Sequence, residues 1–166
     1  MSHETQWLVA LLLPLLAWPE PARAQVGLRP LPSFEARSVE FAREGAMRRL
    51  REPGCQRLLE ELADSDGRPL TAKLASFGMS ADQYLAMIPF LDGTSRPLCK
   101  GGQSQLLTAR GVARIAVCQP FLQTVDRERV TAEVYVIHEM LHTLGLGENP
   151  PSSQEITQRV KRQCAP

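Results

Sequence analysis

Apolar residues in the first half of the chain recur at the spacing of a helix. Within a stretch that begins at Phe34, one stripe three or four positions apart consists of Val39, Ala42, Ala46 and Leu50. Residues at this spacing share one helix face, and Pro53-Gly54 interrupts the pattern. We therefore predict a helix from Phe34 to about Leu50.

Similar patterns, bounded by turn residues, predict the elements that follow. Helices are expected at 55–63, at 70–77, from 81 onward and at about 127–144. Strands are expected at 87–91, 105–109 and 112–118, the last two joined around Arg110-Gly111. Pro89 would confine the first strand to a sheet edge or a strand start. The pattern predicts an α+β fold in which helices surround a small mixed sheet.

The N-terminal residues have the pattern of an export signal. Trp7 to Trp18 is apolar but too short to span a bilayer, and Ala22-Arg23-Ala24 offers a small-x-small cleavage site. We expect a signal peptide at 1–24, a mobile leader at 25–33 and a single domain at 34–166. An uncleaved membrane anchor is the alternative. The prediction is a secreted or periplasmic protein that is not stably inserted in the membrane after cleavage.

The net charge of the chain does not indicate a strongly charged binding partner. The chain has 19 Lys and Arg against 18 Asp and Glu, a formal net charge of +1. A balance this close to zero favours neither nucleic acid nor an anionic membrane as a partner. The modest basic cluster of Arg48, Arg49, Arg51 and Arg57 is typical of a solvated helix face. We expect a monomer.

Four cysteines, without a Cys-x-x-Cys pair, suit an exported protein with two disulfides. Three pairings are possible. Cys99 and Cys118 fall in one strand-rich stretch, whereas Cys55 and Cys164 fall in helices near opposite ends. This placement favours the pairs 99–118 and 55–164.

The candidate chemistry lies in the apolar run from Val134 to Leu144. It contains His138-Glu139-Met140-Leu141-His142, in which two histidines four positions apart lie one turn above each other on a helix. Both imidazoles can then reach one Zn²⁺, and Glu139 is the candidate general base for a zinc-bound water. The alternative is an amphipathic helix whose histidines are merely satisfied polar groups.

A third ligand must be sought after the helix. Gly145 and Gly147 allow the chain to fold back under the metal, which would bring Glu148 toward it. The only other histidine, His3, falls in the predicted signal peptide. Carboxylates are therefore the main candidates, Glu148 first and then Glu155, with Asn149 a distant third.

These residues resemble the extended zinc motif of the metzincin metallopeptidases, His-Glu-x-x-His-x-x-Gly-x-x-His, and matrixin-like members most of all. The resemblance covers roughly residues 134–148 and extends more weakly to the C-terminus, where residues 151–156 resemble the capped start of the family's last helix. Two features depart from the family: Glu148 stands at the third ligand position, and no methionine follows Met140 to form the methionine turn.

The resemblance implies a zincin-like fold, in which the zinc helix backs the sheet and a peptide substrate lies along one sheet edge. It implies a zinc metallopeptidase in which Glu139 deprotonates the metal-bound water that attacks the peptide carbonyl. Tyr135, one turn before His138, is a candidate for orienting a ligand or stabilising an oxyanion, although a half-buried aromatic is the simpler reading.

Two other functions remain open. One is a zinc-containing binding protein of the cell envelope without turnover, favoured by the missing methionine turn. The other is a metal-dependent amidase acting on the cell wall. Retention of Glu139 favours an enzyme, because a purely structural zinc site has no use for a base.

Overall fold

The computed structural model describes residues 28–165. Its elements in chain order are β1 (Arg29–Pro30), α1 (Ser33–Leu50), α2 (Pro53–Glu61), α3 (Leu70–Phe77), α4 (Ala81–Met87), β2 (Phe90–Asp92), α5 (Pro97–Lys100), β3 (Leu106–Leu107), β4 (Ile115–Val117), α6 (Gln119–Arg127), α7 (Arg129–Thr143) and α8 (Ser153–Cys164). The predicted signal peptide, residues 1–24, lies outside the described residues.

The four strands form one small mixed sheet in the order β1-β2-β4-β3. The β2–β4 pair is parallel, and the two outer strands β1 and β3 run antiparallel to their neighbours. The expected α+β class with a small mixed sheet is therefore confirmed. The predicted hairpin forms in the expected place, with Leu106 opposite Val117, but its strands are shorter than predicted.

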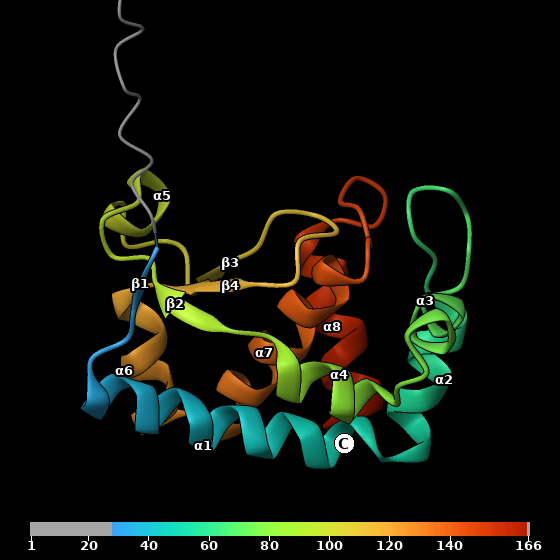
Figure 1. Cartoon of the computed structure of the whole chain (residues 1–166), viewed down its shortest axis with the longest axis horizontal. Coiled ribbons are helices and arrows are strands. Elements are labelled where there is room, and N and C mark those ends of the chain that lie inside the picture. The colour runs from blue at the N-terminus through green and yellow to red at the C-terminus, as the bar shows by residue number, and fades with distance from the viewer. Residues whose placement is uncertain (1–27, 166) are drawn as a thin grey trace, which may run out of the picture.

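Helix α7 is the central element of the molecule. It packs against α1, α6 and α8 and also against β3 (Figure 1). Its buried apolar side chains are Ala132, Val134, Val136, Ile137, Met140 and Leu141. A helix that is apolar on most sides must be covered by other elements, and α7 is buried in this way. The histidines of the motif are therefore held on a rigid support.

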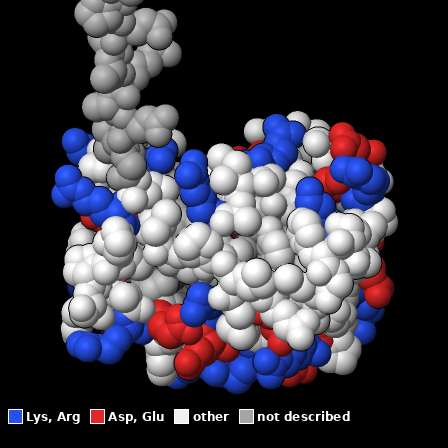
Figure 2. All heavy atoms as spheres, viewed as in Figure 1, with Lys and Arg blue, Asp and Glu red and all other residues white. Residues whose placement is uncertain are grey.

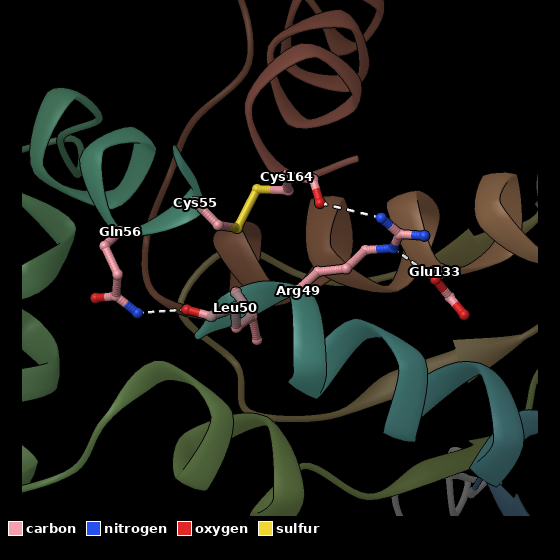
Figure 3. The surroundings of a disulfide bond; sticks show 6 residues. All are labelled: Arg49, Leu50, Cys55, Gln56, Glu133 and Cys164. Atoms are coloured by element: carbon pink, nitrogen blue, oxygen red, sulfur yellow. Dashed lines mark hydrogen bonds and ion pairs between the residues drawn. A yellow bond between two sulfur atoms is a disulfide. The ribbon is translucent and has the colours of Figure 1, made fainter. Parts of the chain in front are cut away.

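Two disulfides fix the periphery of this core. Cys55–Cys164 joins α2 to the last residue of α8 (Figure 3). Cys99–Cys118 joins α5 to the residue that follows β4. Both pairings are those that the sequence favoured. Cys55 and Cys164 are fully buried, and α8 is thereby attached to the N-terminal helices as well as to α7.

A buried carboxylate joins α7 to α1. Glu133 is 4% exposed and accepts hydrogen bonds from Arg49 Nε at 2.5 Å and Arg129 Nε at 3.1 Å. Arg49 also donates to the carbonyl oxygen of Cys164 at 3.2 Å, beside the disulfide (Figure 3). Gly45 leaves the space that the Glu133 side chain fills, because a Cβ at this position would overlap the carboxylate. We call Glu133, Arg49 and Arg129 the Glu133 cluster.

Several predicted boundaries were wrong. Met87 ends helix α4, so the strand predicted at 87–91 begins only at Phe90, after Pro89. Part of the expected leader, Arg29–Pro30, is a strand of the sheet. The helix that carries the His-Glu-x-x-His motif, predicted at 127–144, begins at Arg129 because residues up to Arg127 belong to α6.

Helix α6 was not predicted at all. Its sequence signal is short: Pro120 in the first turn, then Phe121 and Val125 four positions apart, both buried. A proline in the first turn is compatible with a helix start, because the missing N–H has no partner there in any case.

The surface of the described chain carries both signs of charge. On the face shown in Figure 2, acidic and basic side chains lie close together along the edge formed by α1, and much of the remaining face is uncharged. Within residues 28–165, no helix has the length and apolar character that crossing a bilayer requires.

Candidate metal centre

The two motif histidines lie as the helical spacing predicts. His138 and His142 are both buried, on successive turns of α7, and their Nε2 atoms are 3.0 Å apart. Two imidazoles that direct the same nitrogen to one point form half of a metal site.

The turn after α7 brings a carboxylate to the same point. Gly145 takes a φ of 108°, a conformation that side chains disfavour, and the chain folds back there. Glu148 Oε1 then lies 3.3 Å from His142 Nε2 and 3.9 Å from His138 Nε2. The ligand atoms of His138, His142 and Glu148 all lie within 4.8 Å of one another, and together they could hold a metal ion.

The other imidazole nitrogens have partners that orient the rings. His142 Nδ1 lies 2.9 Å from the carbonyl oxygen of Leu146, which can only accept, so this nitrogen donates. His142 Nε2 is then free to bind a metal. His138 Nδ1 lies 2.9 Å from the hydroxyl of Thr157 on α8. Such outer partners are typical of metal-binding histidines.

The donor set fits zinc. Tetrahedral zinc with bonds of about 2.0–2.1 Å keeps its ligand atoms roughly 3.3 Å apart. The three separations among His138, His142 and Glu148 are 3.0, 3.3 and 3.9 Å and lie on both sides of this value. Glu148 is 43% exposed, so its side chain can adjust without disturbing the core.

The protonation of His138 also suits a metal ligand. Burial, and next the neighbouring His142, lower the pKa of His138 to about 4. The ring is therefore neutral at physiological pH and can offer a lone pair.

Glu139 lines the same pocket as the three ligand candidates. Burial raises the pKa of the Glu139 carboxyl, and the charge of Glu148 acts in the same direction. His142 and the hydroxyl of Thr108 act in the opposite direction and lower the pKa, although the Thr108 hydroxyl makes no well-formed hydrogen bond within the described chain. A carboxyl whose pKa is raised above its ordinary value holds a proton more readily, which suits a group that must take and return one.

The pocket has a volume of about 580 Å³ and lies between α7, the start of α8 and the segment 103–108, which includes β3. Strand β3 is an edge strand, so the sheet offers it no partner on its outer side. Tyr135 lines the pocket, as its position one turn before His138 suggested. The alternative ligands Glu155 and Asn149 are exposed and do not line it.

Sequence reasoning did not identify three further pocket residues: Thr157, Thr108 and Arg110. Thr157 follows Glu155 by two positions on α8, and nothing in its local pattern distinguishes it. Thr108 and Arg110 belong to the predicted hairpin, but only the fold places the hairpin over α7.

Comparisons with known proteins give no family. No protein-family model, no curated protein and no solved structure matches this chain.

Proposed function

We propose that this chain is an exported zinc-dependent metallopeptidase with a zincin-like fold. The observation that carries the proposal is that His138, His142 and Glu148 converge in one pocket beside Glu139, whose pKa is raised. The two disulfides and the predicted signal peptide support export.

Each of these pocket residues has a separate role in the proposed reaction. His138, His142 and Glu148 would hold the zinc, which when bound acidifies water and polarises a carbonyl oxygen. Glu139 accepts the proton of the attacking water and later delivers it to the leaving amine. Thr157 and the Leu146 carbonyl keep the two imidazoles in the orientation and tautomer that metal binding requires.

The edge strand β3 supplies a place for a peptide. In the sheet that residues 28–165 form, its outer backbone groups face no other strand, and the segment that contains it lines the pocket. An extended peptide can hydrogen-bond to such an edge and so lay one of its own peptide bonds across the metal centre. This arrangement favours a peptide over a small ester as the substrate.

A zinc-containing envelope protein without turnover is the second candidate. Its support is that no methionine follows Met140, so the residue that metzincins place under the metal has no counterpart. A cell-wall amidase would use the same site and differs only in substrate.

The first test is zinc content of the oxidised protein after signal cleavage, together with hydrolysis of peptide and muropeptide libraries. We expect about one zinc per chain, which Glu148→Ala lowers and Glu155→Ala leaves unchanged, because Glu155 lies outside the pocket. Circular dichroism of each variant checks that the chain remains folded.

The outcomes separate the candidates. Cleavage of peptides supports the peptidase, and cleavage confined to muropeptides supports the amidase. Zinc binding without any turnover supports the binding protein. A folded wild-type chain that binds no zinc would refute all three.

A further inference from the structure

Among the described residues that line the metal pocket, Arg110 carries the one permanent positive charge. It lies at the tip of the β3–β4 hairpin, just beyond the segment 103–108. The proposed function assigns roles to the histidines and carboxylates of this pocket but none to Arg110.

The backbone around Arg110 is attached to the metal centre. The N–H of Gly111 donates to the carbonyl oxygen of His142 at 2.8 Å, so the hairpin tip is tied to the end of α7. The guanidinium lies against Gly147: a Cβ built on that glycine would be 3.4 Å from Arg110 Nη1. Arg110 is thus held beside the loop that carries Glu148.

The guanidinium of Arg110 makes no ion pair within residues 28–165, unlike several other arginines. Arg43, Arg49, Arg51, Arg68 and Arg129 each pair with a carboxylate. Arg110 is exposed to the pocket mouth, and its five N–H donors are available to a ligand.

The charge balance of the loaded pocket favours an anion. A bound Zn²⁺ offsets the two carboxylates, Glu139 and Glu148, even when both are ionised. The charge of Arg110 is then in excess. A guanidinium matches a carboxylate with two parallel hydrogen bonds, a geometry that Lys cannot provide.

We infer that Arg110 is a specificity-determining residue that binds a carboxylate of the substrate, so that the preferred substrates are acidic peptides. This inference rests on the proposed function and names its substrate class. The other end of the pocket is lined by uncharged residues, Gln103, Ser104 and Gln105. The preference is therefore confined to one position of the peptide, at the end of β3 that leads into Arg110.

The test uses zinc-loaded protein that carries Glu139→Gln, so that binding is measured without turnover. The probes are fluorescent alanine-rich peptides in which a single Glu, or a single Gln as the neutral match, is moved along the sequence. Each peptide is made with a C-terminal acid and a C-terminal amide, which distinguishes a side-chain carboxylate from the terminal one. Affinity is measured by fluorescence polarisation, and zinc content is measured on the same samples.

We expect one Glu position, or the terminal acid, to bind about 10–100-fold more tightly than its neutral match, as for a charge-assisted hydrogen bond to a partly exposed group. Arg110→Ala brings the ratio of the affinities for the acidic peptide and its neutral match to about one, in a protein that still binds zinc. Arg110→Glu reverses it in favour of a Lys-containing peptide. Arg114→Ala, an exposed arginine of the same hairpin that does not line the pocket, leaves the preference unchanged.

The possible failures can be told apart. If the protein binds zinc but has equal affinity for acidic and neutral peptides, Arg110 does not select the substrate. The zinc site of the proposed function is then unaffected. If Arg110→Ala leaves an observed acidic preference intact, the residue assignment is wrong. If the protein binds no zinc, the proposed function fails, and the inference fails with it.

Discussion

Helix α7 carries a buried glutamate, Glu133, and a half-buried one that lines the pocket, Glu139, and their surroundings differ. Glu133, near the start of the helix, lies between Arg49 and Arg129. Glu139, six residues later, forms no ion pair with a basic side chain of residues 28–165, and burial raises its pKa. The Glu133 carboxylate is thus neutralised by arginines of the protein itself. The Glu139 carboxylate remains available to a group that enters the pocket.

The difference shows how one helix serves two purposes. A buried charge with matched partners locks elements together, here α7, α1 and the end of α8 (Figure 3). A carboxylate without such partners costs stability and is retained where its proton is needed. The same residue type is therefore structural at position 133 and a candidate base at position 139.

The largest effect is expected from Glu139→Gln. This change removes the group that accepts the proton, so hydrolysis of a cleaved peptide should fall by about 10²–10⁴-fold. Zinc content should stay at the wild-type level, because Glu139 is not among the ligand candidates. Turnover and metal content are measured on the same preparation, and an active Glu139→Gln protein would refute the assignment.

The same substitution at Glu133 should act on stability instead. Glu133→Gln leaves Arg49 and Arg129 without their counter-charge, and breaking a buried pair costs about 3–5 kcal/mol. Because both arginines are partly exposed, we expect a loss near 3 kcal/mol in the free energy of unfolding. Urea denaturation measures it.

Glu60→Ala on the exposed face of α2 is the control for Glu133→Gln. Surface changes of this kind usually stay within about 0.5 kcal/mol. If Glu133→Gln costs no more than the control, the Glu133 cluster contributes nothing to stability and the contrast with Glu139 fails.

Substitution of Thr157 tests whether zinc binding depends on residues that contact the histidine ligands rather than the metal. Thr157→Val keeps the shape but removes the hydroxyl that meets His138 Nδ1, so zinc affinity should fall by about 10–100-fold. Thr157→Ser should restore most of it, and Gln158→Ala, exposed on the same helix, should have no effect. Competition with a zinc chelator gives the affinities, and equal values for Val and Ser would contradict the role.

The smallest effect concerns pH and the metal-free protein. Because burial raises the pKa of Glu139, the proton is held more tightly in the folded than in the unfolded chain. Below the ordinary glutamate pKa of about 4.3, Glu139 is protonated in both the folded and the unfolded chain, so its ionisation costs no stability. As the pH rises from there toward the pKa of Glu139 in the folded chain, the wild type loses stability relative to Glu139→Gln. Thermal unfolding of both proteins from acid to neutral pH measures the difference, and parallel curves would contradict it.

Much of this protein was predictable from local sequence. The spacing of His138 and His142 sets their positions on one helix face, because four residues make about one turn. Glycine at 145 signals where that helix ends, since its positive φ is disfavoured for other residues. The α+β class and the disulfide pairs followed from the placement of apolar and cysteine residues.

The boundaries that were wrong share a physical cause. Arg29–Pro30 is only two residues long and repeats no pattern. Helix α6 begins directly after Cys118 and is separated from α7 by Glu128 alone, so no turn sequence marks it off from its neighbours. Such elements are stabilised by what they pack or pair with, here α1 and α7 for the helix and β2 for the strand.

The partners of the candidate site were decided by the tertiary structure alone. Thr157 meets His138 because α8 packs on α7, and Arg110 reaches the pocket because the hairpin tip is tied to His142. Glu133 and Glu139 look alike in the sequence, and only their neighbours from other elements distinguish them. Local sequence sets the spacing of groups along one element, whereas burial, charge compensation and pKa depend on groups that distant segments bring together.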